Sequence, residues 1–119
     1  MQQQPQQQQP QTQQIVGPPA NLSPTPRNLH TLWHEYEFGI GGNKAAKYFT
    51  PHERGQVKDK YTRRKVIWDC ILRQINRSIP YNIAIDRIYQ VYGENSTVTN
   101  IINRMRKDKK DNNLHVTLH

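Results

Sequence analysis

From residue 28 to residue 105, the apolar residues of this chain recur three and four positions apart. The first such group is Leu29, Leu32, Trp33 and Tyr36. This spacing places side chains on one face of an α-helix, whereas a half-buried strand alternates apolar and polar residues. No stretch of useful length alternates in that way. The sequence therefore predicts an all-α fold, a compact bundle of about four helices packed around Trp33 and Trp68.

The longest predicted helix has the clearest start signal. Thr50 and Glu53 match a capping box, and Pro51 between them suits the first helical position. An apolar stripe then continues from Val57 to about Asn76. One helix is therefore expected over this whole stretch.

Caps and helix breakers bound the other three predicted helices. These extend from Asn28 to Gly39, from Pro80 to Gly93, and from a cap at Asn95 or Ser96 to about Asp108. The last two helices, with Gly93 between them, match a helix-turn-helix. An ordinary antiparallel pair of helices fits the same pattern equally well.

The first 26 residues differ sharply from the rest of the chain. They contain no Lys, Arg, Asp or Glu, and Gln and Pro are their commonest residues. Such a segment has too little apolar surface to offset the entropy cost of folding. We expect a disordered Gln/Pro-rich tail over residues 1–26, a basic helical domain over residues 27–110, and a frayed polar tail over residues 111–119.

The composition of the N-terminal tail suggests two functional roles. Glutamine-rich tails often accompany transcription-related modules, so transcription co-regulators are candidate partners. Ser23-Pro24 and Thr25-Pro26 match the dipeptide that proline-directed kinases modify.

The charge of the chain is strongly basic. Seventeen Lys and Arg against nine Asp and Glu give a net charge of +8, which falls entirely after residue 26. Charge of this density indicates a polyanionic partner, nucleic acid first and an anionic membrane surface second. No apolar run approaches the roughly 18 residues of a membrane span, and no signal peptide is recognisable, so we expect an intracellular protein without a membrane role. Cys70 is the single cysteine, which excludes an internal disulfide and a cysteine-based zinc site.

Two basic clusters account for most of this charge. The first lies in the helix predicted from Pro51 and comprises Arg54, Lys58, Lys60, Arg63, Arg64 and Lys65. The second lies near the end of the last predicted helix and comprises Arg104, Arg106, Lys107, Lys109 and Lys110. Basic residues also suit the dipole at a helix C-terminus. Two clusters without a balancing acidic face nevertheless favour nucleic-acid binding over a merely solvated surface.

Polar residues on the outer side of the last predicted helix add a means of reading bases. They are Thr97, Thr99, Asn100 and Asn103. An Asn amide can pair with the major-groove edge of adenine, and hydroxyl groups can reach phosphates.

The three consecutive basic residues Arg63, Arg64 and Lys65 cannot all face one groove, because successive residues of a helix turn by about 100°. Arg63 points away from the apolar stripe and is the better candidate for a DNA contact. Arg64 lies close to the line of Trp68, where a structural role is equally open.

Signals for catalysis and metal binding are weak. His30 and His34 lie one helical turn apart, as do His115 and His119, but neither pair has a third ligand at a recognisable spacing. No Ser, Cys or Lys shows the local signature of an activated nucleophile. We therefore expect no enzymatic activity, no catalytic residue, no metal and no cofactor.

One run of residues is similar to a known family. Lys60-Tyr61-Thr62-Arg63-Arg64-Lys65-Val66-Ile67-Trp68-Asp69, with residues 33–39 before it and 84–89 after it, resembles the DNA-binding domain of the fungal transcriptional activators of glycolytic genes. The similarity extends from about Leu29 to Lys110. It implies a sequence-specific, nuclear DNA-binding module, related forms of which accompany mobile elements and centromere-binding proteins. It also implies DNA-binding roles for Tyr61, Arg63, Arg64 and Lys65.

The sequence therefore predicts a duplex DNA-binding domain of a nuclear transcription regulator. The alternatives are a non-specific RNA- or nucleic-acid-binding protein, a DNA-binding protein of a mobile element, and a protein-interaction module whose basic segments direct nuclear import. The oligomeric state is left open. The predicted DNA-binding residues are Lys58, Lys60, Tyr61, Arg63, Arg64, Lys65, Thr97, Thr99, Asn100, Asn103, Arg104, Arg106 and Lys107.

Overall fold

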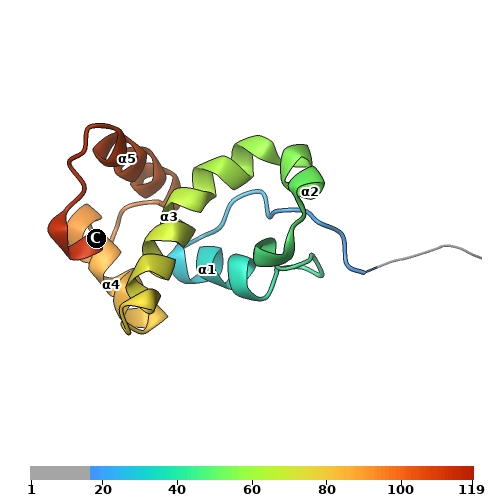
Figure 1. Ribbon diagram of the computed structural model, residues 1–119, viewed down its shortest axis with the longest axis horizontal. Helices are drawn as coiled ribbons and strands as arrows, with labels where there is room; N and C mark the ends of the chain where they lie inside the picture. The colour runs from blue at the N-terminus through green and yellow to red at the C-terminus, as the bar shows by residue number, and fades with distance from the viewer. Residues whose placement is uncertain (1–16) are drawn as a thin grey trace, which may run out of the picture.

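The computed structural model describes residues 17–119, and these residues form helices and connections without a strand (Figure 1). The α-helices are α1 (Leu29–Glu37), α2 (Pro51–Gln56), α3 (Lys58–Asn76), α4 (Tyr81–Tyr92) and α5 (Val98–Lys110). Two short 3-10 helices, η3 (Ala46–Tyr48) and η4 (Val116–Leu118), complete the described chain. The predicted all-α fold is confirmed.

The helix predicted from Pro51 to Asn76 is in fact two helices. The capping box is present: Thr50 Oγ1 accepts a hydrogen bond from the Glu53 amide at 3.2 Å, and the Thr50 amide donates to Glu53 Oε1 at 2.9 Å. The chain then leaves helical geometry at Val57 (φ −125°, ψ 34°). Gly55 weakens the helix just before this break, and the change of direction lets the half-buried Val57 pack against the core. Residues 17–119 consequently contain one more α-helix than expected.

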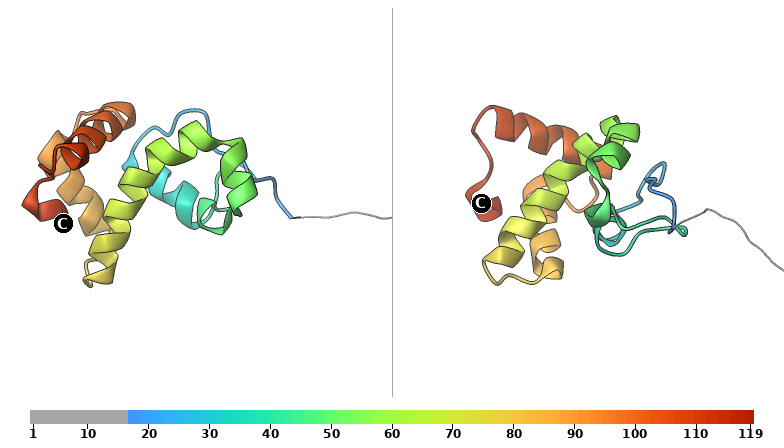
Figure 2. Two further views of the ribbon diagram at one scale, coloured as in Figure 1. Left: turned by 45° about the horizontal axis from the view of Figure 1, so that its top comes forward. Right: turned by 45° about the vertical axis from the view of Figure 1, so that its right-hand side comes forward.

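Helix α3 is the centre of the structure. It packs against α1, α4 and α5, and α1 also contacts α4, where the Leu29 amide donates to the Tyr89 hydroxyl at 3.0 Å (Figure 1, Figure 2). Its Trp68 is fully buried and donates its indole N–H to the carbonyl of Leu32 in α1 at 2.9 Å. Trp33 is also buried, so the prediction of a core around these two tryptophans is confirmed.

The segment before α1 packs against the helices rather than forming part of a tail. Residues 21–26, here called the strap, contain Leu22, whose side chain is only 2% exposed in the core. The Ser23 amide donates to Oε2 of Glu35 at 2.7 Å, and the Lys44 amide donates to the carbonyl of Pro19 at 2.8 Å. The expectation of a disordered tail up to residue 26 is thus wrong for the strap, because one apolar side chain and these polar contacts hold it. Residues 1–16 of that expected tail lie outside the described residues.

The C-terminal residues also return to the core. After α5 the chain turns back to η4, where the Leu118 side chain is fully buried. The Leu118 carbonyl accepts hydrogen bonds from Cys70 Sγ at 3.8 Å and from Arg73 Nη2 at 3.4 Å, both on α3. The buried Leu118 side chain and these hydrogen bonds therefore hold residues that were expected to fray.

Candidate nucleic-acid interface

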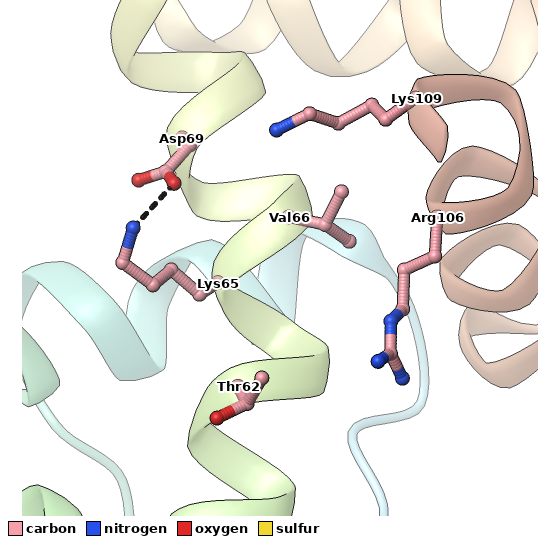
Figure 3. Close-up of a pocket in the computed structure, with 6 residues that line it drawn as sticks. All are labelled: Thr62, Lys65, Val66, Asp69, Arg106 and Lys109. Carbon is pink, nitrogen blue, oxygen red and sulfur yellow. Dashed lines mark hydrogen bonds and ion pairs between the residues drawn. The ribbon is translucent and has the colours of Figure 1, made fainter. Parts of the chain in front are cut away.

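Helices α3 and α5 enclose a surface groove that joins the two basic clusters (Figure 3). Its lining residues are Thr62, Lys65, Val66 and Asp69 from α3, with Arg106 and Lys109 from α5. The Lys109 side chain extends from α5 toward α3 in this view. We call this feature the α3–α5 groove. Sequence alone did not place these clusters side by side, because more than 30 residues separate them.

The groove contains one acid among its cations. Lys65 Nζ lies 2.7 Å from Asp69 Oδ2, one helical turn along α3 (Figure 3). This hydrogen bond is the main cause that raises the pKa of Lys65 above its ordinary value, so the ammonium group is charged at neutral pH. Asp69 offsets part of the positive charge of the groove.

A hydrogen bond between two side chains connects α3 and α5 beside the groove. Arg63 Nη2 on α3 donates to Asn103 Oδ1 on α5 at 3.0 Å. A guanidinium has five N–H donors, so this bond uses one of them. Arg63, predicted to contact DNA, and Asn103, one of the two Asn residues predicted to pair with adenine, thus lie together on one surface.

The other predicted lysines and the polar face of α5 are accessible. Exposed side chains are those of Lys58, Lys60, Thr99, Asn100, Arg106 and Lys107. Lys107 Nζ lies 2.6 Å from Asp111 Oδ2, and this hydrogen bond raises the pKa of the Lys107 ammonium. These residues form a cationic and amide-bearing surface around the α3–α5 groove.

Arg64 does not belong to that surface. Its side chain is 6% exposed, and Nη1 lies 2.6 Å from Oε1 of the buried Glu35 on α1. Its Nη2 donates to the carbonyls of Ser23 at 2.5 Å and Pro24 at 3.2 Å. The prediction that Arg64 contacts DNA is therefore corrected: its guanidinium neutralises a buried acid and holds the strap against the core.

Glu35 is the residue that the sequence analysis missed. Its side chain is 2% exposed, although acids are almost never fully buried without a partner. Glu35 lies three positions after Leu32, on the apolar face of α1. A carboxylate at that register is the signal that could have indicated a buried basic partner.

Tyr61 has a packing role at the junction of α2 and α3. Its half-buried ring lies 5.3 Å from the ring of Trp68 and 6.1 Å from that of Phe49, measured between centroids. The guanidinium of Arg54 lies 5.8 Å from the same ring, and Arg54 Nη1 donates to the carbonyl of Phe49 at 2.8 Å. The basic run thus contains an aromatic residue that fixes the direction of α2.

Thr97 caps α5, rather than Asn95 or Ser96 as the sequence suggested. Its Oγ1 accepts a hydrogen bond from the Asn100 amide at 3.1 Å. One turn beyond Asn100, Arg104 Nη1 donates to the carbonyl of Tyr92 at 3.0 Å, and its guanidinium lies 5.1 Å from the Tyr92 ring. Arg104 thereby satisfies a carbonyl at the C-terminus of α4 and fixes the connection between the two helices.

A second pocket lies where the strap meets α3 and the first turn of α5. Its polar lining includes Thr25 of the strap, Lys60 and Arg63 of α3, and Thr99 of α5. We call it the strap pocket. Arg63 lines this pocket and also donates to Asn103, so it connects the strap pocket with the polar face of α5.

Within residues 17–119, no three His, Cys, Asp or Glu side chains gather in a way that could hold a metal ion. Among the same residues, no helix has both the length and the apolar character needed to cross a membrane. Cys70 is buried, and this burial raises the pKa of its thiol.

The fold and the groove define an all-helical module with a cationic surface. Residues 21–91 match a family model described as a transcriptional activator of glycolytic enzymes. The match covers more than half of the chain, so the chain belongs to that family, which is one of transcriptional activators rather than of enzymes. The matched region begins at the strap and ends in α4, so α5 lies beyond it. No curated protein and no solved structure matched the chain.

Proposed function

We propose that this protein is a sequence-reading, duplex DNA-binding transcription regulator that acts in the nucleus. The observation that carries the proposal is the α3–α5 groove, which is lined by Lys65 of the first basic cluster and by Arg106 and Lys109 of the second. Two separated cationic segments on one surface can neutralise several phosphates at once, and their mutual repulsion has no benefit for folding.

The exposed Lys and Arg side chains around the groove make the phosphate contacts. A phosphate contact needs charge and reach rather than a fixed orientation, and Lys58, Lys60, Lys65, Arg106 and Lys107 have both. These contacts supply affinity and set the position of the domain along the duplex. They do not select a sequence.

The residues that contact the bases are Arg63, Asn100 and Asn103. Arg forms paired hydrogen bonds with guanine, and Asn forms them with adenine, in the major groove. The bond between Arg63 and Asn103 restricts both side chains before DNA arrives, which lowers the entropy cost of ordering them on the duplex. The exposed face of α5 with Thr99 and Asn100 is the face that enters the major groove, as in a helix-turn-helix.

Duplex DNA fits this surface better than single-stranded RNA. None of the six side chains lining the α3–α5 groove is aromatic, and Trp33 and Trp68 are buried in the core. Proteins that bind unpaired bases stack them on exposed aromatic rings. The Gln/Pro-rich residues before the domain suit contact with transcription co-regulators, and that part of the proposal rests on composition.

The test is a competitive selection with the full chain. The protein is incubated near physiological salt with a random duplex DNA pool and a random RNA pool together, and the retained molecules are sequenced. We expect enrichment of one short duplex motif, with affinity that falls as salt rises. Retention of duplex DNA without enrichment of any motif, preference for RNA, or no retention of nucleic acid would each overturn the proposal. A Lys65→Ala/Arg106→Ala variant is the matched control and should retain less of either pool.

A further inference from the structure

The strap pocket is cationic, and no carboxylate lines it. Lys60 and Arg63 contribute charge from α3, and Thr25 reaches the pocket from the strap. Arg64 also lines it, but Glu35 neutralises that guanidinium at 2.6 Å. Two cationic side chains of the pocket, Lys60 and Arg63, therefore have no lining carboxylate to neutralise them and can bind an anion.

Thr25 is the strap residue placed to supply that anion. Its side chain is exposed, it lines the pocket, and Pro26 follows it directly. A phosphorylated threonine has three acceptor oxygens and a charge of about −1.5 to −2 at pH 7. Opposite two basic side chains, such a group forms charge-assisted hydrogen bonds.

We propose that Thr25 is a phosphorylation site, and that its phosphate occupies the strap pocket against Lys60 and Arg63, where it withdraws Lys60 from a DNA phosphate and Arg63 from a base. A proline-directed kinase transfers the γ-phosphoryl group of ATP to Thr25 Oγ1. The hydroxyl proton is released, and ADP leaves. The binding of this phosphate in the strap pocket is inferred from the pocket residues alone. Its effect on DNA affinity rests on the proposed function.

The neighbouring Ser23-Pro24 dipeptide is a poorer site for the same chemistry. The Ser23 amide donates to Glu35 Oε2 at 2.7 Å, and the Ser23 carbonyl accepts from Arg64 at 2.5 Å. The Ser23 hydroxyl accepts from Arg64 Nη1 at 3.4 Å, and Glu35 already pairs with that guanidinium, so a phosphate there would compete with a buried carboxylate for the same cation. Thr25 lies beyond these anchoring contacts.

The kinase needs the strap to open before it can act. Pro26 is buried, whereas a proline-directed kinase must reach the proline after the modified residue. The strap belongs to no helix or strand, so its opening breaks no regular backbone ladder. Modification takes place on the open strap, and the phosphate is bound once the strap closes.

The decisive experiment installs phosphothreonine at position 25 of the full chain by genetic encoding. The control is the full chain with phosphoserine at Ser78, an exposed position at the opposite end of α3. Affinity for the selected duplex is measured as a function of salt. We expect the Thr25 phosphate to raise Kd on the order of tenfold at 0.1 M salt and to reduce the salt slope by about one phosphate contact, that of Lys60. Equal changes of Kd and salt slope in the two phosphoproteins would overturn the proposal that the Thr25 phosphate regulates DNA binding.

A measurement without DNA keeps the two proposals separable. The phosphorus resonance is titrated with pH in both phosphoproteins, and again after Lys60→Ala/Arg63→Ala substitution. Docking predicts a lower phosphate pKa at position 25 than at position 78, and loss of the difference in the double variant. Identical phosphate pKa values at the two positions would overturn the proposal that the phosphate binds in the strap pocket. If the unmodified chain binds no DNA, the proposed function fails, while this titration still tests the pocket.

The modification itself is tested with a proline-directed kinase and ATP, followed by peptide mapping of the full chain. We expect phosphate on Thr25 and its disappearance in a Thr25→Ala variant. Absence of phosphate from Thr25 in the folded chain would overturn the assignment of this residue as a kinase site.

Discussion

Arg64 of α3 and Glu35 of α1 form an ion pair inside the protein, with Nη1 and Oε1 2.6 Å apart and side-chain exposures of 6% and 2%. The same guanidinium binds the Ser23 and Pro24 carbonyls of the strap. One basic residue therefore joins three segments of the chain. Its neighbours in the basic run, Arg63 and Lys65, carry their charge on the surface.

Arg64→Ala should destabilise the fold rather than weaken DNA binding selectively. Removing one partner of a buried pair leaves an uncompensated charge, which costs roughly 3–5 kcal/mol. Urea denaturation of Arg64→Ala should show this loss of unfolding free energy. Arg63→Ala, one residue earlier, should change the unfolding free energy by less than about 1 kcal/mol. Wild-type stability together with loss of DNA affinity in Arg64→Ala would restore Arg64 to the DNA-binding surface.

Arg63→Ala should weaken binding to the selected duplex. If Arg63 reads a base, the loss is about 1–3 kcal/mol and discrimination at one position relaxes. Binding assays on the selected site and on its single-base variants measure both effects. Arg87→Ala removes the same charge from α4, away from the groove, and should leave affinity nearly unchanged. Equal losses in the two variants would mean that net charge alone explains the binding.

Asp69→Asn should strengthen DNA binding. The substitution removes the one acid that lines the α3–α5 groove and releases Lys65 from its 2.7 Å contact. We expect affinity to rise about threefold at 0.1 M salt, because a negative charge that faces the phosphates is lost. Fluorescence anisotropy with labelled duplex measures the change. Asp86→Asn on α4 has the same chemistry outside the groove, and a comparable gain there would argue against the groove as the interface.

Leu118→Ala should destabilise the domain although it lies near the end of the chain. Truncating a fully buried leucine costs about 2–5 kcal/mol through lost burial and the cavity that remains. Val116, two residues earlier, is 77% exposed, so Val116→Ala should leave the unfolding free energy within about 0.5 kcal/mol of wild type. Chemical denaturation of both variants decides the point. Equal stability of the two variants would mean that η4 does not pack in solution.

The capping box of α2 predicts a pH dependence. Hydrogen bonding from Lys44 is the main cause that lowers the pKa of Glu53 below its ordinary 4.5, and the Thr50 amide adds to it. A carboxyl group with a lowered pKa in the folded state stabilises the fold above pH 4.5. That contribution is lost as the pH falls through the folded-state pKa. The stability difference between wild type and Glu53→Gln should therefore shrink on acidification from pH 6 to pH 3.

Denaturation series at several pH values test this dependence. Glu94→Gln, which changes an exposed acid in the connection before α5, serves as the control and should not reproduce the pattern. A difference between wild type and Glu53→Gln that stays constant with pH would contradict the account of the capping box.

Local chemistry was enough to predict most of the helical elements. The spacing of apolar residues, the cap at Asn28, the capping box at Thr50 and the stop at Gly93 act over three or four residues, and the structure contains each of them. The break at Val57 was not predicted. It depends on how α2 packs against the loop before it, through Arg54 and the Phe49 carbonyl, and no periodicity in the sequence encodes that contact.

The sequence by itself determined the helical class of the fold, the two basic clusters and the family to which the chain belongs, because these depend on residue identity and short-range spacing. Only the tertiary structure decided which basic residues are available to a ligand. It buried Arg64 against Glu35, ordered the strap and Leu118, and brought Lys65 and Arg106 to one groove. The physical reason is that desolvation and ion pairing depend on neighbours in space, and those neighbours come from segments about 30 to 40 residues apart in the chain.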